Sequence, residues 1–483
     1  MRSPLLRQLT RGLPRPARSF VTSARFKVNA DTPAQPAIAS TIDSVVESVK
    51  VHPLKPSDAS NKHHATDKRI GLSLATVEVV KPASVSHRAY GLSITAPGVH
   101  TISLNYTYLR DICKCPQCVD RYSKQRNIRT NDIPTDIRPR HIKWDGEYLE
   151  IQWATDIPGA SPDHISRWHH SYLQKPTLDT HDLHDASNKP VTWDRKNMEK
   201  HQHWVSYEDY MTNDAKFAAS MRNLQRAGLV FVKDIPDSRE EVEKIATRIG
   251  PLRNTFYGMT WDVRTVPEAR NVAYTNQFLG FHMDLMYMNE PPGYQFLHCL
   301  ENSCDGGESL FADAFRAASK MRRQHPKEFK ELTERKMGYE YVHEDQIYYN
   351  ERPVFELDES RKHFRHVNYS PPFQSAIPIR GKLRFQPLKE ALDVFTQMLE
   401  SKEMTFDLKL NPGECVIFDN RRIVHARRHF NTSTGSRWLA GAYVDTDAVL
   451  SRFNVTSKKQ PDAWRAADPL KHVPSLNKDK KTA

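Results

Sequence analysis

Apolar and polar residues alternate at short intervals in the first half of the chain. The segments SLATVEVVK, VHTISLNYTYLRDIC and EYLEIQW combine β-branched residues with polar ones in this way. Because successive side chains of a strand point to opposite faces, the pattern predicts short, half-buried strands. We therefore expect a small β-rich N-terminal domain over residues 70–200.

A helical period appears farther along the chain, in DAKFAASMRNLQR (214–226) and SREEVEKIATRI (238–249). These segments flank GLVFVKDIP, a buried strand by its composition. Mostly short strands follow, with helical insertions at 311–329 and 389–401. The pattern predicts a second domain over residues 201–456, of α+β class but mainly β.

The N-terminal segment, residues 1–28, is basic and amphipathic. It contains six arginines and Lys27, and no acidic residue precedes Asp31. The leucines of LLRQLTRGL would lie on one face of a helix. This is the composition of a mitochondrial presequence, which predicts a location in the mitochondrial matrix; the alternative is a disordered basic tail or a nucleic-acid-binding arm.

Composition limits the other regions and the partners. Residues 29–69 are typical of a disordered linker, and residues 457–483 of a basic tail. The formal net charge of +12 falls by about seven once the presequence is excluded, and no nucleic-acid recognition motif is present. No run approaches the roughly 18 apolar residues of a membrane span. We therefore expect a small-molecule ligand, with neither nucleic acid nor membrane as partner.

Three of the six cysteines stand together in CKCPQC, as Cys113, Cys115 and Cys118. Clustered thiols that cannot easily pair with one another can bind a tetrahedral Zn²⁺, which needs a fourth ligand. We expect His164 in this position, at the start of a helix after EYLEIQW, and the zinc to be structural. The alternatives are reduced surface thiols, or a different fourth ligand, namely His169, His170 or, in more polar sequence, His181, His184, His201 or His203.

The segment NVAYTNQFLGFHMD ends in His282-Met283-Asp284. On a strand, side chains two residues apart share a face, so His282 and Asp284 could bind one metal ion. Such a pair forms two-thirds of the 2-His-1-carboxylate triad of Fe(II) oxygenases. The motif alone is weak, since His343-Glu344-Asp345 also fits it, but only His282 follows an apolar strand and precedes a buried one.

A third ligand and a cation follow in NPGECVIFDNRRIVHARR and SRWLAGAYVD. His425 ends a second apolar strand, as is needed if two strands of one barrel meet at a metal. Arg437 begins the next antiparallel strand. Its guanidinium could return beside the metal and bind a carboxylate through two parallel N–H bonds.

These four residues together resemble the Fe(II)/2-oxoglutarate dioxygenases, which have a double-stranded β-helix, or jelly roll, as catalytic domain. The segments NVAYTNQFLGFHMD, PPGYQFLHCL, FDNRRIVHARR and RWLAGAYVD are similar to the γ-butyrobetaine dioxygenase and trimethyllysine dioxygenase family. Members of this family also carry a zinc module of the Cys-x-Cys-x-x-Cys plus His type. The resemblance covers roughly residues 70–455.

The resemblance implies a role for each matching residue. Iron would be bound by His282, Asp284 and His425, and the distal carboxylate of 2-oxoglutarate by Arg437. O₂ would be the second co-substrate and ascorbate the reductant, in an enzyme that forms a homodimer. The remaining matches are the substrate-binding Tyr257, Trp261, Asn271, Tyr274 and Tyr443, and the zinc ligands Cys113, Cys115, Cys118 and His164.

The aromatic residues suit a trimethylammonium substrate. A quaternary ammonium has no hydrogen to donate, so it is bound by aromatic faces that contribute about 0.5–2 kcal/mol each. Asn271 and Tyr274 favour γ-butyrobetaine, whereas the presequence and VNYSPPF (367–373) leave trimethyllysine open. A relative acting on another small amine or acid, a nucleic-acid-modifying dioxygenase and a non-catalytic metal-binding scaffold are the further alternatives.

Overall fold

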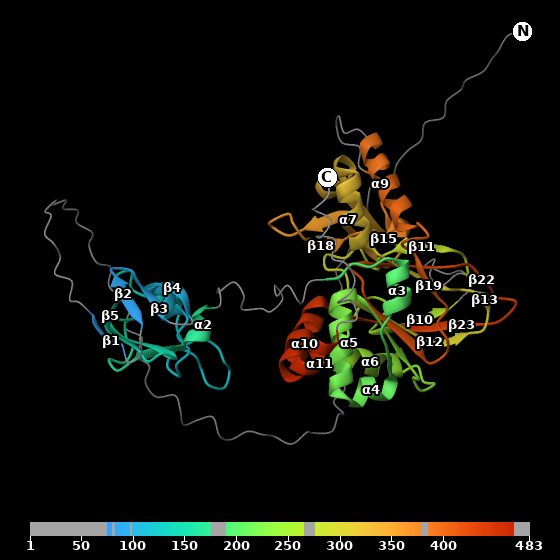
Figure 1. The fold of residues 1–483 in the computed structure, drawn as a ribbon. Coiled ribbons are helices and arrows are strands. Elements are labelled where there is room, and N and C mark those ends of the chain that lie inside the picture. The colour runs from blue at the N-terminus through green and yellow to red at the C-terminus, as the bar shows by residue number, and fades with distance from the viewer. Residues whose placement is uncertain are drawn as a thin grey trace, which may run out of the picture. The chain divides into compact units, whose positions relative to one another are not determined.

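The computed structural model describes residues 75–79, 83–96, 99–174, 190–264, 276–377 and 385–467. The expected presequence and linker lie outside these residues, and so do Asn271 and Tyr274. Figure 1 shows two bodies, built from residues 75–174 and 190–467. Each is described by itself.

The N-terminal body holds two small sheets. Strands β2, β3 and β4 form one, and β1, β5, β6 and β7 form the other in the order β1-β5-β6-β7. Their buried residues make one core that includes Trp144, Trp153 and Trp168. The elements are β1 (Thr76–Val79), β2 (Ser84–Arg88), β3 (Gly91–Ala96), β4 (Val99–Asn105), α1 (Tyr106–Asp111), β5 (Arg138–Trp144), β6 (Tyr148–Thr155), β7 (Ile165–His169) and α2 (His170–Gln174).

One expectation in this body is wrong. His164 was predicted to begin a helix, but it directly precedes the strand β7. The segment that follows His164 is a strand because its side chains alternate between buried and exposed: Ser166 and Trp168 are buried, whereas Ile165 and Arg167 are exposed. That alternation belongs to an edge strand.

The second body contains two sheets that face one another. One has six strands in the order β10-β23-β12-β20-β9-β8, and the other has four in the order β11-β21-β14-β19. The six-stranded sheet comprises β8 (Trp204–Ser206), β9 (Leu229–Lys233), β10 (Thr260–Arg264), β12 (Tyr294–Asn302), β20 (Glu414–Asp419) and β23 (Arg437–Val444). The four-stranded sheet comprises β11 (Leu279–His282), β14 (Ser309–Asp313), β19 (Phe406–Leu408) and β21 (Ile423–Arg427).

Helices pack on the outer face of each sheet, and Figure 1 shows those beside the six-stranded sheet. Those over the six-stranded sheet share its outer core; they are α4 (Tyr207–Thr212), α5 (Asp214–Ala227), α6 (Glu241–Ile249), α10 (Thr446–Lys459) and α11 (Pro461–Ala466). Those over the four-stranded sheet are α7 (Ala314–Gln324), α8 (Pro326–Glu334) and α9 (Phe385–Leu399). The remaining elements are α3 (Arg195–His201), β13 (Asp305–Gly306), β15 (Lys336–Val342), β16 (Ile347–Pro353), β17 (Phe355–Leu357), β18 (Phe364–Val367), the 3-10 helix η6 (Pro371–Phe373) and β22 (Phe430–Asn431).

This arrangement confirms the expected jelly roll, with more helix than "mainly β" implied. The inner faces of the two sheets meet in a core that includes Leu297, Phe311 and Phe418. On β12 the next residues, Phe296 and His298, point to the helices instead, as strand geometry requires. The fold is therefore a mixed α and β jelly roll whose inner surface is available for a site.

Both ends of the second body extend beyond the expected range. Trp193, which precedes residue 201, is fully buried in the inner core, where its backbone N–H donates to Asp313 Oδ2 at 3.1 Å. At the other end, α10 runs past residue 457, and Trp464 of α11 packs into the outer core. Residues 457–459 and 461–466 are thus helical, and Trp464 is buried against Phe453, with 6.2 Å between the ring centroids.

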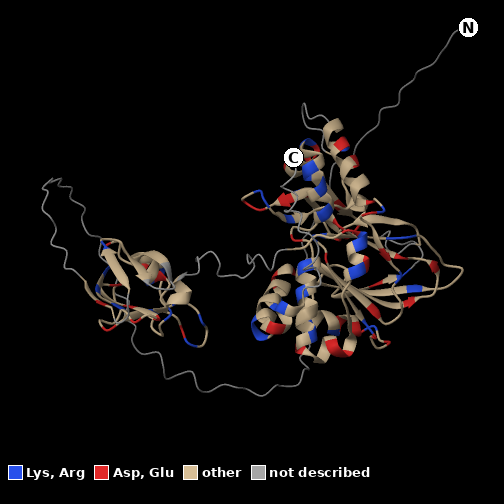
Figure 2. Ribbon diagram, in the orientation of Figure 1, with Lys and Arg blue, Asp and Glu red and all other residues tan. Residues whose placement is uncertain are grey.

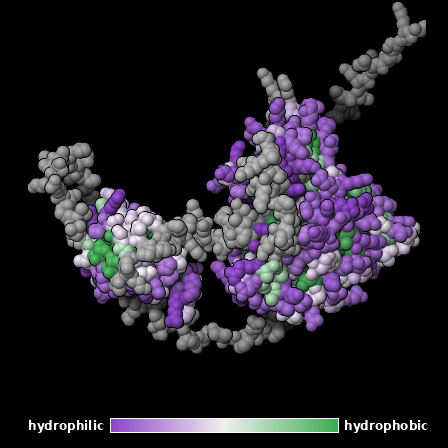
Figure 3. Space-filling model, in the orientation of Figure 1, coloured by the Kyte–Doolittle hydropathy of each residue, from purple (hydrophilic) through white to green (hydrophobic). Residues whose placement is uncertain are grey.

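The side of the molecule turned to the viewer in Figures 2 and 3 is mostly polar and mixed in charge. Figure 2 shows basic and acidic residues interspersed along the helices, and Figure 3 shows small apolar areas scattered among hydrophilic ones. Among the described helices, none combines the length and apolar character that crossing a membrane requires.

Candidate active site

The two histidines predicted to bind iron are neighbours across two paired strands. His282 ends β11, and its register partner on β21 is His425. Their ring centroids are 4.1 Å apart. Asp284 Oδ1 lies 3.3 Å from His282 Nε2 and 3.9 Å from His425 Nε2. One ligand atom from each residue lies within 4.8 Å of the others, so the fold brings the three side chains to one point.

The backbone that positions Asp284 differs from the one that the sequence predicted. It lies in the turn after β11, and not on the strand with His282. Its backbone N–H donates to Asn420 Oδ1 at 2.8 Å, and Asn420 Nδ2 donates to the carbonyls of Asp284 and Pro292, at 3.1 and 3.0 Å. Leu285 follows with a φ of 59°, a conformation that is strained for a leucine. The fully buried Asn420 therefore fixes the turn that carries the carboxylate.

The polar atoms around the three residues suit a divalent metal. His282 Nδ1 lies 2.9 Å from the Gly280 carbonyl oxygen. With the proton on Nδ1 donated to that carbonyl, the lone pair of Nε2 is free to bind a metal. Burial lowers the pKa of His425 to about 3, which keeps this imidazole neutral. Burial alone would raise the pKa of Asp284, but the hydrogen bond with His282, the electrostatic interaction with both imidazoles and the hydrogen bond from Tyr443 lower it overall. Two imidazoles and one carboxylate are the donor set that fits Fe(II).

Tyr443 joins the aromatic wall of the site to this donor set. Its hydroxyl donates to Asp284 Oδ2 at 2.5 Å. Its ring stacks on Trp261 with centroids 4.0 Å apart and planes at 29°. Gly441 is required beneath the stack, because a Cβ there would lie 2.4 Å from the Trp261 ring. Each of the two rings therefore covers one face of the other, so the pair offers a ligand fewer free aromatic faces than two separate rings would.

A cavity of about 810 Å³, measured out to open solvent, surrounds these groups. The six-stranded sheet contributes Trp261, Val263, Gln295, Leu297, Arg437, Leu439 and Tyr443. The four-stranded sheet contributes Leu279, His282, Ser309, Phe311, His425, Ala426 and Arg427. Tyr257, Asp284, Leu285 and Phe373 complete the lining. A largely apolar cavity with a few polar groups has the character of a small-molecule site.

Tyr257 stands at the edge of an aromatic cluster. Its ring lies 4.2 Å from Phe256 and 6.4 Å from Tyr341, and Tyr287 and Tyr348 pack within the same cluster. Of the five predicted substrate residues, Tyr257, Trp261 and Tyr443 thus line the same cavity as His282, Asp284 and His425. The placement of Asn271 and Tyr274 is outside the described residues.

Arg437 lines the cavity from the six-stranded sheet, and Arg427, which the sequence analysis did not select, lines it from the opposite sheet. Burial lowers the pKa of each to about 10, for Arg427 with a further contribution from Arg437, so both remain charged at neutral pH. Their guanidinium carbons lie 5.0 and 5.7 Å from the Phe430 ring centroid. Arg427 stands two residues after His425 on one strand, and the period-2 argument applied to His282 could have found it.

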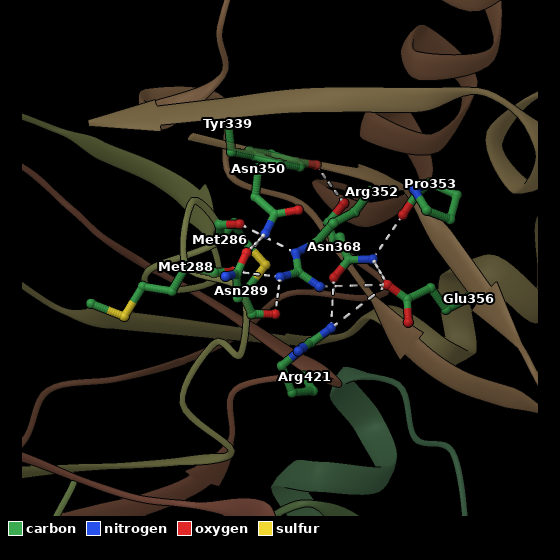
Figure 4. A network of polar contacts seen from close by, with 10 residues as sticks. All are labelled: Met286, Met288, Asn289, Tyr339, Asn350, Arg352, Pro353, Glu356, Asn368 and Arg421. Carbon is green, nitrogen blue, oxygen red and sulfur yellow. Dashed lines mark hydrogen bonds and ion pairs between the residues drawn. The ribbon is translucent and has the colours of Figure 1, made fainter. Parts of the chain in front are cut away.

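The turn after Asp284 is also held from its far side. Figure 4 shows Arg352 beside this turn: it donates to the carbonyls of Met286 (3.3 Å), Met288 and Asn289 (2.6 Å). Asn350 Nδ2 bonds Asn289 Oδ1 at 2.8 Å. Hairpin β15–β16 thereby fixes the backbone that follows the Asp284 carboxylate.

The cysteine cluster in the N-terminal body assembles as the sequence analysis expected. The Sγ atoms of Cys113 and Cys118 each lie 3.5 Å from His164 Nε2, and Cys115 completes a set whose ligand atoms lie within 4.8 Å of one another. His164 Nδ1 lies 2.7 Å from Asp156 Oδ2, and Arg110 donates to both Asp156 Oδ1 (2.5 Å) and Cys118 Sγ (3.1 Å). A carboxylate behind a ligating histidine is the usual support of a zinc site.

Comparison with known proteins matches both bodies. The model of the taurine catabolism dioxygenase TauD, TfdA family matches residues 195–443, and that of the gamma-butyrobetaine hydroxylase-like N-terminal family matches residues 84–160. Dioxygenase str8 of Strobilurus tenacellus is 34% identical over 391 residues, which cover 77% of this chain and 90% of the relative. Gamma-butyrobetaine dioxygenase of Homo sapiens is 29% identical, with 73% of this chain and 90% of the relative covered.

Two further matches are more distant. Mitochondrial trimethyllysine dioxygenase of Homo sapiens is 28% identical, over 72% of this chain and 81% of the relative. The crystal structure of a taurine dioxygenase from Burkholderia xenovorans superimposes with a TM-score of 0.39 and 16% identity, covering 55% of this chain and 98% of the other.

Proposed function

The chain belongs to the taurine catabolism dioxygenase TauD, TfdA family and is a 2-oxoglutarate-dependent dioxygenase, and on that premise we propose that it hydroxylates a small trimethylammonium compound. The substrate that we favour is γ-butyrobetaine, with L-carnitine as product. The observation that carries the proposal is the aromatic wall of Tyr257, Trp261 and Tyr443 beside the three metal-binding side chains.

The wall matches the chemistry of a quaternary ammonium. Such a cation needs an electron-rich surface without a demand for hydrogen bonds, which aromatic faces supply. Asp284 is the acidic residue of the cavity lining, and it is engaged by His282 and Tyr443. A permanent cation can thus be held near the metal without forming an ion pair with a metal ligand.

Each remaining group of the site has a role in this reaction. His282, Asp284 and His425 would hold Fe(II), and Arg437 the distal carboxylate of 2-oxoglutarate. Bound iron and 2-oxoglutarate supply the oxidation of a C–H bond by O₂, coupled to decarboxylation of the 2-oxo acid. The chain contributes position: the stacked Trp261 and Tyr443 set which carbon of the substrate faces the iron, and the apolar wall excludes water.

A substrate panel tests the proposal. Purified protein with Fe(II), 2-oxoglutarate and ascorbate is given γ-butyrobetaine, trimethyllysine or their des-methyl analogues, and hydroxylated product is measured. We expect turnover of γ-butyrobetaine and loss of turnover as methyl groups are removed. Equal turnover of the dimethylamine analogue would contradict recognition by aromatic faces, and preference for trimethyllysine would establish the second candidate. A non-catalytic scaffold would release equal succinate with wild type and Asp284→Ala.

We also propose a structural zinc at Cys113, Cys115, Cys118 and His164. The support is the convergence of the four ligand atoms, together with Asp156 behind His164. Metal analysis should find zinc and iron in equal amounts, and iron alone would exclude the zinc.

Location and assembly complete the proposal. The basic, leucine-containing segment of residues 1–28 supports import into the mitochondrial matrix. A fusion of that segment to a fluorescent protein should enter mitochondria. The homodimer implied by the family resemblance can be checked by light scattering, in which a mass of one chain would contradict it.

A further inference from the structure

Three consecutive residues at the end of β18 contact both segments that carry the proposed metal ligands. The backbone N–H of Val367 donates to the carbonyl of Arg421 at 2.9 Å, in the turn that leads from β20 to His425 on β21. Two residues later, the carbonyl of Tyr369 accepts the N–H of Met283 at 2.8 Å. Met283 stands between the other two proposed ligands in the sequence. This short segment therefore joins the two parts of the chain that converge on the metal-binding point.

Asn368, the middle residue of the segment, is fully buried, and each end of its amide is engaged. Its Oδ1 accepts a hydrogen bond from Arg421 Nη2 at 2.8 Å. Its Nδ2 donates to the carbonyl of Pro353 at 2.7 Å and to Glu356 Oε1 at 2.8 Å, as Figure 4 shows. A rotated amide would turn its oxygen toward two acceptors, so the side chain is held in one orientation.

Glu356 lies between two cations. Its Oε1 is 3.9 Å from Arg421 Nη2 and 4.0 Å from Arg352 Nη1. Burial, together with the charge of Arg352, lowers the pKa of Arg421 to about 10, so this guanidinium stays charged at neutral pH. Arg352 is also the residue that donates to the backbone of the turn after Asp284. The Glu356 carboxylate and the Asn368 amide therefore connect the cations that are attached to the two ligand-carrying segments.

The contacts of Asn368 matter most for the carboxylate ligand. His282 and His425 are held by the pairing of their strands. Asp284 lies in the turn after β11, outside this pairing, so its place depends on the hydrogen bonds of the turn backbone. In the part of the chain that the structure describes, neither Asn368 nor Arg421 lines the cavity. Any effect of Asn368 on the metal therefore passes through other residues.

We propose that Asn368 is a positioning residue of the metal site, which holds the β20–β21 turn and the Asp284 turn at the separation that lets the three ligands converge. It acts on one turn through Arg421 and on the other through the adjoining carbonyl of Tyr369. The inference rests on the metal ligands of the proposed function. A metal site tolerates shifts of only about 0.2 Å in its ligand distances, so two turns that carry ligands need a fixed separation.

Mn²⁺ tests the proposal without turnover. The electron paramagnetic resonance of this ion reports how tightly it is bound and, at saturation, how its ligands are arranged. Mn²⁺ prefers oxygen and nitrogen ligands to thiolates, so the cysteine cluster of the N-terminal body competes little for it. Asp284→Ala measures the Mn²⁺ that binds elsewhere on the full-length chain. Thermal unfolding of each variant is recorded in parallel.

We expect Asn368→Ala to weaken Mn²⁺ binding about tenfold, at the lower end of the loss that follows when a group supporting a metal ligand is removed. The resonance of the saturated protein should also change. Arg421→Met, which removes the donor to Asn368 Oδ1, should act in the same direction. Tyr210→Phe is the matched control, because it removes a buried hydrogen bond to the Ile245 carbonyl in the outer core. It should lower stability and leave the Mn²⁺ affinity and resonance unchanged.

An exchange of the amide and the carboxylate tests the contact between Asn368 and Glu356. Asn368→Asp alone sets two carboxylates against one another and loses both donated hydrogen bonds. Addition of Glu356→Gln removes the repulsion and lets the introduced amide donate to the introduced carboxylate. The double variant should therefore bind Mn²⁺ more tightly than Asn368→Asp. A double variant that binds no better would show that this contact does not position the ligands.

The proposal is wrong if Asn368→Ala and Arg421→Met retain the wild-type affinity and resonance. It is also wrong if Tyr210→Phe weakens Mn²⁺ binding as much as they do, because affinity then only follows stability. If Asn368→Ala does not fold, Arg421→Met and the exchanged pair decide in the same way. If wild type and Asp284→Ala bind Mn²⁺ equally, the metal site itself is wrong, which is a different result from failure of Asn368 alone.

Discussion

Tyr443 is the residue that connects the proposed substrate wall to the proposed metal site. Its ring packs on Trp261 and its hydroxyl donates to Asp284 Oδ2. Tyr443→Phe removes the hydrogen bond and keeps the stack. We expect Fe(II) to bind about tenfold more weakly, because a hydrogen bond to a charged group contributes about 1.5–3 kcal/mol. Substrate affinity measured at saturating metal should stay within about twofold. Unchanged metal affinity would show that the hydroxyl does not support Asp284.

If the aromatic wall binds a cation, a substitution of Trp261 should weaken substrate binding, whereas Tyr443→Phe weakens metal binding. Trp261→Ala should weaken the trimethylammonium substrate by about tenfold, since a cation on a desolvated aromatic face is worth about 2 kcal/mol. Binding of 2-oxoglutarate should change much less. Trp261→Phe should retain part of the affinity, because a smaller face remains. Equal losses of substrate and 2-oxoglutarate would assign Trp261 to packing against Gly441 and Tyr443.

Site residues differ in whether they can be predicted from the sequence alone. His282, Asp284, His425 and Arg437 could be selected because metal and carboxylate chemistry restricts both residue type and spacing. Gln295 could not, because a glutamine within the apolar run GYQFLHCL carries no spacing signal. Its place in the cavity lining, opposite Tyr443, follows from the strand register, which only the packed structure shows.

At the scale of elements, the turn between β11 and β12 is the part that most needs support. It places Asp284 while Leu285 adopts a positive φ, and Asn420 binds both of its ends. Asn420→Ala should lower the free energy of unfolding by about 1–3 kcal/mol, because buried backbone groups lose their partners. It should also weaken metal binding more than the loss of stability explains.

A matched pair of variants separates these two effects. Asn420→Asp keeps the acceptor for the Asp284 N–H and loses the two donated bonds, so its metal affinity should lie between wild type and Asn420→Ala. Thr212→Ala, which removes a hydrogen bond on the exposed end of α4, controls for general loss of stability. If metal affinity follows stability alone across the three variants, Asn420 does not position Asp284.

Helices and strands with a clear period of hydrophobic residues could be predicted from the sequence. The helix expected at 214–226 is α5, the strand GLVFVKDIP is β9, and the two strands around FDNRR are β20 and β21. The pairing of His282 with Asp284 was attributed to a strand, but a turn held by Asn420 achieves it. Hydrogen bonds between residues more than a hundred positions apart leave no local pattern, which is why period alone could not find this support.

At the scale of the whole molecule, the two bodies have separate cores. The N-terminal core draws on residues 92–173, and the cores of the jelly roll draw on residues 193–464. Cys113 and Cys118 are buried members of the first core, so a zinc ion there would stabilise that core and not the other.

Removal of the zinc should therefore affect one body only. We expect Cys115→Ser, or a strong chelator, to increase amide hydrogen exchange over residues 75–174, because the four ligands lose the ion that holds them together. Exchange over the β strands of the jelly roll should stay within error of wild type, since no ligand of the cluster belongs to those strands. Cys415→Ala, a change in the second core, should leave the zinc content unaltered and serves as the control. Equal loss of protection in both bodies would show that their stabilities are coupled, and unchanged exchange over residues 75–174 would show that the cluster does not need a metal to fold.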